Sequence, residues 1–201
     1  MSFWARNSMI LVLMSGGIDS TLLAERAYRD GILGAGLFID YGQPVAKQER
    51  RTVRTWANKH LVQLIELPCI ISGVEASMQT GVGTDGLRIL PGRNLILAAH
   101  AVNIAKTRGY EEVWLGANAG DQPYPDCRPT WVDALDTLTQ ADTGIKVVAP
   151  LIELSKATII REAHEIGMDL EQTWSCYQPT TDGLPCGSCH SCHERTEVDG
   201  V

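Results

Sequence analysis

Two groups of residues have the types and the spacing that chemistry requires. The first is the string Ser15-Gly-Gly-Ile-Asp-Ser20, which directly follows the apolar run of residues 9–14. Glycines let a backbone turn tightly and approach an anion, and the free N–H groups at the start of a helix attract phosphate. We therefore predict that this string, together with the next residue, binds the polyphosphate of a nucleotide: Ser15, Gly16, Gly17, Asp19, Ser20 and Thr21.

The carboxylate inside this string carries further information. Asp19 would repel phosphate unless a cation bridges the two, so its presence predicts bound Mg²⁺. The sequence contains no Gly-x4-Gly-Lys-Ser/Thr string, so the commoner cleavage between β- and γ-phosphates lacks its lysine. The alternative interpretation is a plain strand-to-helix turn capped by serine.

The second group is a cluster of cysteines near the end of the chain. Cys176 is followed by nine residues and then by Cys186-Gly-Ser-Cys189-His-Ser-Cys192. Two overlapping CxxC steps are typical of zinc sites, and Cys176 supplies the fourth ligand of a tetrahedron. Four thiolates leave no position for water, so the predicted Zn²⁺ is structural. The neighbouring histidines, His190 and His193, are alternative ligands that we expect to be bystanders.

Composition limits the class of protein. The chain has 201 residues, of which 44% are hydrophobic and 20% are charged, with a formal net charge of −7. An acidic balance argues against a large nucleic-acid interface, and we interpret the basic strip at residues 47–54 as a solvated helix face. The sequence contains no apolar run of membrane-spanning length. Clustered cysteines that bind metal are typical of a reducing compartment, so we expect a cytoplasmic protein without nucleic-acid or membrane partners.

Short apolar runs alternate with longer amphipathic ones. This pattern predicts strands at residues 9–14, 35–40, 63–67, 112–117 and 146–151, and helices at 20–29, 45–60, 94–106, 129–142 and 155–167. Such alternation predicts an α/β fold with a doubly wound parallel sheet. Ligands bind beyond the carboxyl ends of such strands, so residues 15–20, 40–43 and 118–128 should lie at one edge.

The periodicity stops near residue 173, where Gly, Pro and Cys become frequent. We therefore predict a nucleotide-binding domain over residues 1–172 and a small zinc-binding appendage over residues 173–201. Residues 68–90 are irregular and receive no assignment. The GxGxxG string at residues 81–86 has no strand before it and no helix after it, so we interpret it as a surface loop.

The phosphate string resembles the pyrophosphate loop of the ATP pyrophosphatase (PP-loop) enzymes, which cleave between the α- and β-phosphates and leave AMP on the substrate. Several further strings occur in the order found in one family. They are Asp40-Tyr-Gly-Gln43, Pro91-Gly-Arg-Asn94, Tyr124-Pro-Asp-Cys-Arg128, Pro150-Leu151 with Lys156, and the cysteine pattern with Arg195. Together they span nearly the whole chain, and they resemble the QueC family of queuosine biosynthesis.

The resemblance implies a carbon–nitrogen ligase that converts 7-carboxy-7-deazaguanine and ammonia to 7-cyano-7-deazaguanine (preQ0), consumes ATP and acts as a homodimer. It implies Asp19, Lys156 and Arg93 as catalytic residues, with Lys156 neutralising the leaving phosphate. For the substrate and the adenylate it implies Tyr41, Gln43, Arg93, Asn94, Asp126 and Arg128. The plainer interpretations of Lys156, Arg93 and the Asp126–Arg128 pair are a surface lysine, an exposed arginine at a helix start and a salt-bridged turn.

Three other functions remain open at this point. The first is a QueC-like enzyme that stops at the amide or passes the activated deazaguanine to a protein or nucleic acid. The second is a PP-loop enzyme that modifies tRNA. The third is a zinc-bearing module that binds nucleotide without turnover.

Overall fold

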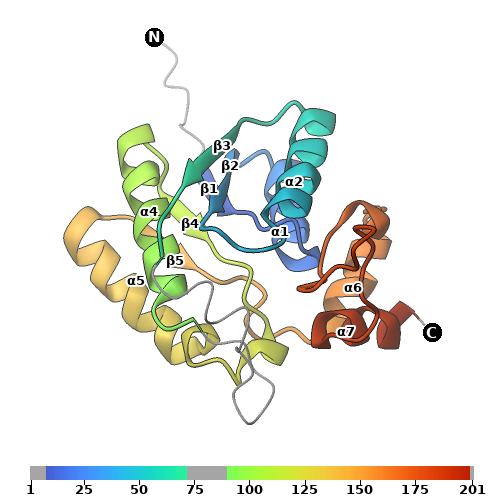
Figure 1. The fold of residues 1–201 in the computed structure, drawn as a ribbon. Helices are drawn as coiled ribbons and strands as arrows, with labels where there is room; N and C mark the ends of the chain where they lie inside the picture. The colour runs from blue at the N-terminus through green and yellow to red at the C-terminus, as the bar shows by residue number, and fades with distance from the viewer. Residues whose placement is uncertain (1–7, 72–89, 200–201) are drawn as a thin grey trace.

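A computed structural model describes residues 8–71 and 90–199 of the chain (Figure 1). A five-stranded sheet lies at the centre, in the order β3-β2-β1-β4-β5. The strands are β1 (Ile10–Leu13), β2 (Leu33–Asp40), β3 (Leu64–Pro68), β4 (Glu112–Trp114) and β5 (Lys146–Val148). All four neighbouring pairs are parallel, which confirms the predicted parallel sheet. The GxGxxG string at residues 81–86 lies outside the described residues.

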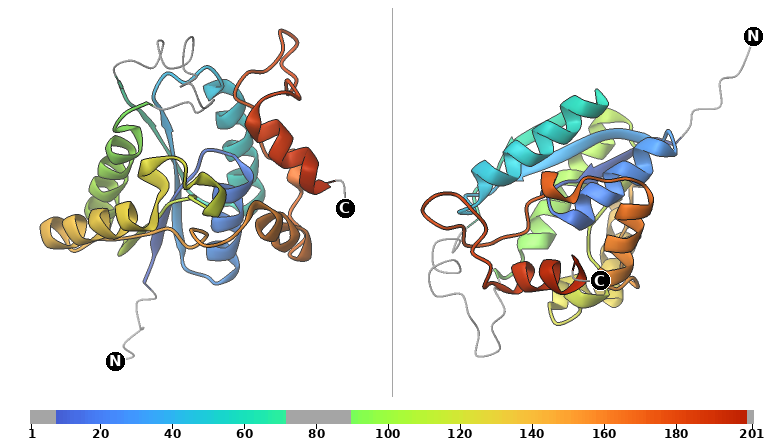
Figure 2. Two further views of the ribbon diagram at one scale, coloured as in Figure 1. Left: turned by 90° about the horizontal axis from the view of Figure 1, so that it is seen from below. Right: turned by 90° about the vertical axis from the view of Figure 1, so that its right-hand side faces the viewer.

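Helices cover both faces of the sheet, as Figure 2 shows. One face carries α1 (Ile18–Arg29), α2 (Ala46–His60) and α6 (Lys156–Glu165); the other carries α4 (Arg93–Arg108) and α5 (Pro129–Thr143). The last helix, α7 (His190–Asp199), contacts α6. The sheet is therefore doubly wound, as predicted. In the described ranges, the helices are too short or too polar to cross a membrane.

The first strand contributes side chains to both halves of the core. Ile10 and Val12 pack with α1, α2 and α6, whereas Leu11 packs with α4 and α5. Successive side chains of a strand point to opposite faces, and a strand covered on both faces is therefore apolar throughout. This requirement explains the continuous apolar run of residues 9–14.

The fourth and fifth strands are shorter than the sequence predicts. The N–H of Leu115 still donates to the carbonyl of Val148 at 2.8 Å, but the chain then leaves the sheet at Gly116. A Cβ on Gly116 would lie 3.3 Å from the backbone nitrogen of Ser20, so the start of α1 approaches closely here. β5 ends shortly before Pro150, which has no N–H for a strand ladder.

The chain order reverses at β1, which lies between β2 and β4. A reversal of this kind opens a crevice beyond the carboxyl ends of the two strands that flank it. The phosphate string follows β1, and the loop of residues 118–128 follows β4. Three short helical turns, η1 (Ala119–Asp121), η2 (Pro125–Cys127) and η3 (Leu170–Gln172), shape the loops around this edge.

Candidate active site and metal centre

The phosphate string forms a tight turn between β1 and α1. Gly16 has φ +80°, in the left-handed region that favours glycine. A Cβ at this position would lie 3.1 Å from the carbonyl oxygen of Glu49 and from the side chain of Thr52. Both observations favour glycine at position 16, because the first two turns of α2 lie directly against this turn.

Hydroxyl groups close the turn around the start of α1. The backbone N–H of Ser15 donates to Oγ of Ser20 at 3.2 Å, and the two serine hydroxyl oxygens lie 3.3 Å apart. Gly17 is the N-cap of α1 in extended conformation, and the helix leaves its first N–H groups without intrahelical partners. Thr21 lies behind the turn: it is buried, and its Oγ1 has no hydrogen-bond partner within the described residues.

Asp19 and Lys156, which are 137 positions apart in the sequence, form an ion pair. Nζ of Lys156 lies 2.8 Å from Oδ1 and 2.7 Å from Oδ2 of Asp19. Burial lowers the pKa of Lys156, but the charge and the hydrogen bond of Asp19 outweigh it, so the pKa is raised overall. Lys156 is therefore a cation held beside the phosphate turn.

Asn118 links Asp19 to a second carboxylate. Its Nδ2 donates to Asp19 at 3.1 Å and to Asp121 at 2.8 Å, and its backbone N–H donates to Asp121 at 3.0 Å. Burial raises the pKa of Asp121 to about 6, with a smaller contribution from the charge of Asp19. Asp121 was not among the residues predicted from the sequence, although the loop of residues 118–128 was predicted to lie at this edge.

A cavity of about 290 Å³ opens beside these groups, close to the lower limit for small-molecule sites. Nine of the predicted site residues line it: Ser15, Gly17, Asp19, Ser20, Tyr41, Gln43, Arg93, Asn94 and Asp126. The lining also contains four polar residues that were not predicted as site residues, namely Glu49, Asp121, Tyr124 and Tyr177.

Four predicted residues do not line the cavity. Gly16 is part of the phosphate turn, and Thr21 lies behind it. Lys156 contacts the site through its ion pair with Asp19. Arg128 is exposed, and its Nε donates to the carbonyl of Gln122 at 2.9 Å. Its guanidinium therefore holds the loop that follows β4 rather than facing the cavity.

Arg93 provides a partly buried positive charge on the cavity wall. It begins α4 directly after Gly92, and its Nε donates to Oδ1 of Asn94 at 3.2 Å. Burial lowers the pKa of Arg93, but Tyr41, Asp126 and Tyr177 together raise it, so the group stays charged. Asn94 also lies against the Asp126 loop, whose carbonyl oxygen is 3.5 Å from Nδ2. A fixed guanidinium in a cavity can bind an anionic ligand.

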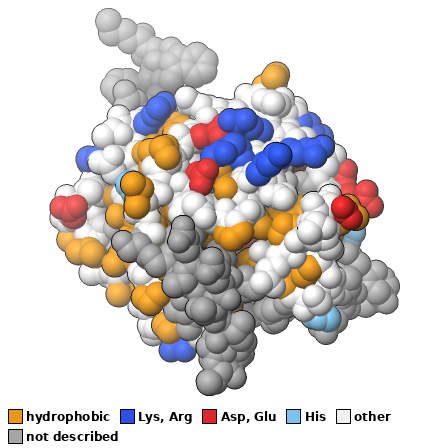
Figure 3. Space-filling model, viewed as in Figure 1, with side chains coloured by type: hydrophobic (Ala, Val, Ile, Leu, Met, Phe, Trp, Pro, Cys, Tyr) orange, Lys and Arg blue, Asp and Glu red, His pale blue; other side chains and the backbone are white. Residues whose placement is uncertain are grey.

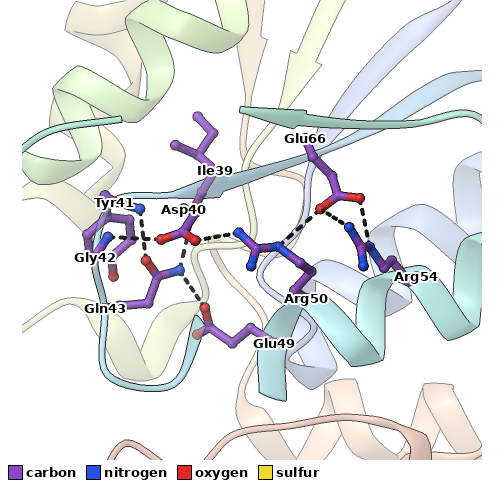
Figure 4. A network of polar contacts seen from close by, with 9 residues as sticks. All are labelled: Ile39, Asp40, Tyr41, Gly42, Gln43, Glu49, Arg50, Arg54 and Glu66. Atoms are coloured by element: carbon purple, nitrogen blue, oxygen red, sulfur yellow. Dashed lines mark hydrogen bonds and ion pairs between the residues drawn. The ribbon is translucent and has the colours of Figure 1, made fainter. Parts of the chain in front are cut away.

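The side-chain amide of Gln43 forms hydrogen bonds with neighbouring residues of the chain (Figure 4). Oε1 accepts from the backbone N–H of Tyr41 at 2.9 Å, while Nε2 donates to the carbonyl of Ile39 at 3.3 Å and to Glu49 at 2.7 Å. Gln43 is buried. It therefore shapes the turn after β2, and it places Tyr41 and Glu49 on the cavity wall.

The basic strip of α2 lies outside the cavity. Figure 3 shows Lys and Arg side chains gathered on this face with acidic side chains among them. Arg50 pairs with Asp40 and with Glu66, and Arg54 lies 2.8 Å from Glu66 (Figure 4). These arginines already have carboxylate partners, in keeping with the predicted solvated helix face.

The four cysteines of the cluster meet as predicted. The sulfur atoms of Cys176, Cys186, Cys189 and Cys192 all lie within 4.8 Å of one another. A ZnS₄ tetrahedron with bonds of about 2.3 Å requires sulfur separations of about 3.8 Å, and Cys186 and Cys192 are 4.0 Å apart. The backbone N–H of Cys186 also donates to the sulfur of Cys176 at 3.2 Å. The donor set fits a metal ion.

The sequence profile of the family described as "Queuosine biosynthesis protein QueC" matches residues 9–198. The chain belongs to the QueC family. This QueC-family chain is 36% identical over 203 residues to 7-cyano-7-deazaguanine synthase 1 of Sphingopyxis alaskensis, covering 92% of this chain and 91% of the relative. It is 35% identical to the 7-cyano-7-deazaguanine synthase of a Synechococcus species, covering 96% and 92%.

Among solved structures, the fold of this QueC-family chain is similar to that of NMN synthetase from Francisella tularensis. The TM-score is 0.56, and the match covers 97% of this chain and 78% of the synthetase. At 14% sequence identity this likeness concerns the fold alone.

Proposed function

We propose that this QueC-family enzyme is a 7-cyano-7-deazaguanine synthase. It joins 7-carboxy-7-deazaguanine to the nitrogen of ammonia and consumes ATP. The proposal rests chiefly on one observation: the phosphate turn and the guanidinium of Arg93 line one cavity in a chain that resembles named synthases along nearly its whole length.

The reaction needs two activations of the same carbon. A carboxylate is a poor electrophile, because its charge repels nucleophiles and oxide is a poor leaving group. Attack of the carboxylate on the α-phosphate of ATP releases pyrophosphate and leaves AMP on the acyl oxygen. Ammonia then displaces AMP and gives the amide. A second adenylation, on the amide oxygen, lets AMP leave again as the nitrile forms. The protein contributes positioning and neutralisation of charge.

The phosphate turn binds the pyrophosphate part of ATP. Ser15 and Ser20 donate hydroxyl hydrogen bonds, and the backbone N–H groups near Gly17 complete the anion site. Gly16 lets the turn lie against α2, and Thr21 supports it from behind.

Asp19 and Asp121 are the carboxylates that would hold Mg²⁺. They fit this role because both line the cavity and both accept from the same amide group of Asn118, and oxygen ligands of this kind suit Mg²⁺. Bound Mg²⁺ would neutralise charge on the phosphates. Lys156, held on Asp19, stabilises the departing pyrophosphate.

The opposite wall holds the acyl group and the base. Arg93, with Asn94, binds the substrate carboxylate or the adenylate phosphate. Tyr41 and Asp126 contact the rings. Gln43 and Arg128 act indirectly, since Gln43 fixes the turn after β2 and Arg128 fixes the loop after β4.

The four cysteines hold a structural Zn²⁺, which leaves the reaction to the cavity. A reducing cytoplasm is the proposed compartment, because these sulfurs must remain thiols to bind metal. The division into residues 1–172 and 173–201, the homodimer and the absence of a nucleic-acid partner are likewise proposals.

The test is to incubate the purified protein with ATP, Mg²⁺, ammonium and 7-carboxy-7-deazaguanine. We expect AMP release that depends on the base, and a product with the mass of the nitrile. A product that stays at the mass of the amide would replace the proposal with amide synthesis. AMP release only with tRNA, or ATP binding without AMP release, would overturn it.

A further inference from the structure

Glu49 lies on the buried side of α2, next to the phosphate turn. Its spacing to the buried residues Val53 and Trp56 is i, i+4, i+7, which places all three on one helix face. Its own carbonyl oxygen is the atom that a Cβ on Gly16 would approach to 3.1 Å. The Glu49 side chain lines the cavity together with Ser15.

One oxygen of this carboxylate is held, and the other is available. Oε2 accepts from Nε2 of Gln43 at 2.7 Å, and Gln43 is itself fixed by the backbone of Ile39 and Tyr41. Figure 4 shows the two side chains pointing toward one another between the end of β2 and the start of α2. Among the residues that the structure describes, no group donates a hydrogen bond to Oε1. The carboxylate is thus fixed in place with acceptor capacity left over.

The surroundings of Glu49 raise the pKa of its carboxyl group towards neutral pH. Burial raises the pKa of Glu49 to about 7, and the charge of Asp40 adds to this effect; the hydrogen bond from Gln43 and the charge of Arg93 oppose it. Tyr41 also faces the group from the turn after β2, and Arg50 of α2 pairs with Asp40. Glu49 therefore exchanges its proton near neutral pH.

The other acidic residues that line the cavity have different neighbours. Asp19 is paired with Lys156, Asp121 accepts from Asn118, and Asp126 lies in the field of Arg93. The first two belong to the phosphate side of the site. Glu49 stands on α2, between the phosphate turn and the turn after β2.

A ligation to nitrogen requires a base, because dissolved ammonia at neutral pH is mostly ammonium, which has no lone pair. A carboxylate attracts this cation and can also accept its proton. A carboxyl group whose pKa is raised towards that of ammonium makes the transfer less costly than an ordinary one.

We infer that Glu49 is the ammonium-binding base of this site. A proton passes from ammonium to Oε1 of Glu49; the freed lone pair forms a bond to the acyl carbon, and AMP leaves with the electrons of the bond that joined it to that carbon. The nitrogen then loses a second proton to solvent, which leaves the neutral amide. The proton on Glu49 then returns to solvent. This inference rests on the proposed function, since it concerns the nitrogen step of that reaction.

The test compares two nucleophiles in the Glu49→Gln variant. Hydroxylamine is neutral at pH 7 and needs no base before it attacks. Pyrophosphate exchange into ATP, dependent on 7-carboxy-7-deazaguanine, should stay close to wild type, because adenylation precedes the nitrogen step. The kcat/KM for ammonium should fall about 100-fold or more, while formation of the hydroxamate with hydroxylamine should remain close to wild type.

The pH profile gives a second, independent readout. At fixed total ammonium, kcat/KM of the wild type should rise as Glu49 ionises and level off above about 7. The variant can use only free ammonia, so its rate should keep rising about tenfold per pH unit. The wild-type profile needs no variant: a steady rise with no levelling would overturn the inference.

The matched control is Glu66→Gln, which removes a carboxylate that pairs with Arg54 and does not line the cavity. It should behave as wild type with both nucleophiles. Equal losses with ammonium and hydroxylamine in Glu49→Gln would mean that Glu49 only supports Gln43, and unchanged use of ammonium would also refute the inference. If the wild type shows no exchange that depends on 7-carboxy-7-deazaguanine, the proposed function itself fails and the inference falls with it.

Discussion

The backbone N–H of Trp174 donates to the carbonyl oxygen of Gly16 at 2.8 Å. This bond joins the phosphate turn to the segment that leads into the cysteine cluster, because Trp174 lies two residues before Cys176. Arg195 of α7 secures the same segment through Oγ1 of Thr173 at 3.0 Å. A single hydrogen bond and two residues of chain therefore connect the metal site to the proposed nucleotide site.

We expect loss of the metal to weaken ATP binding. Cys186→Ser removes one thiolate and should release Zn²⁺. Residues 173–176 are then no longer held in place, and the phosphate turn loses the hydrogen bond from Trp174. A single net hydrogen bond is worth about 1 kcal/mol, so the Kd for ATP should rise about fivefold in calorimetry, alongside loss of zinc in elemental analysis. Cys69→Ser, which removes a thiol outside the cluster, should keep both values. Unchanged ATP affinity in a zinc-free protein would refute the coupling.

The Asp19–Lys156 pair should behave as one unit. Lys156→Met leaves Asp19 next to Asp121 without its cation, and Asp19→Asn removes the proposed Mg²⁺ ligand. Each change should lower the rate of adenylation about 100-fold or more, and the double variant should lose much less than the product of the two. Pyrophosphate exchange is the measurement. Lys146→Met, which removes a half-exposed lysine paired with Glu112, should have no effect; full additivity would contradict a shared role.

Much of this architecture follows from local sequence patterns. The apolar first strand, the Ser-Gly-Gly turn and the cysteine spacing each specify their own structure, and the alternation of elements specifies a parallel sheet. The order of the strands then places the loops after β1 and β4 side by side. These are short-range or topological rules, so one sequence is enough to apply them.

Contacts between distant side chains could not be predicted in the same way. The residues around Asp19 and Lys156 in the sequence do not specify that the two side chains meet. Arg128 was predicted to bind substrate, but its guanidinium instead contacts the backbone of its own loop. Asp121 lay in a predicted loop but had no distinguishing spacing. The burial of Glu49 could have been predicted, since it shares a helix face with Val53 and Trp56. It lies within the basic strip of residues 47–54, however, which was interpreted as solvated throughout.

Asp121 should destabilise the folded protein at neutral pH. Its pKa rises from 3.8 to about 6 on folding, so between these values the folded state binds more protons than the unfolded state. Stability from this group is therefore full at low pH and is lost as the pH rises through about 6. Asp121→Asn should raise the free energy of unfolding by about 2–3 kcal/mol at pH 7 and by about half as much at pH 5 in urea titrations. Asp182→Asn, at an exposed position, should change neither value, and an equal gain at both pH values would contradict the explanation.

Gly16→Ala should weaken nucleotide binding, and Gly31→Ala provides the matched control. Both glycines have positive φ, +80° at Gly16 and +69° at Gly31, so both substitutions strain the backbone by about 1–2 kcal/mol. Only the Cβ at Gly16 meets neighbours, 3.1 Å from Glu49 and Thr52, whereas nothing lies within 4 Å at Gly31. The two variants should therefore lose similar stability from strain, but only Gly16→Ala also pushes the turn away from α2. Calorimetry with ATP should show binding close to wild type for Gly31→Ala and a loss of more than about tenfold for Gly16→Ala. Equal ATP affinities would mean that close packing of the turn against α2 is not needed to bind phosphate.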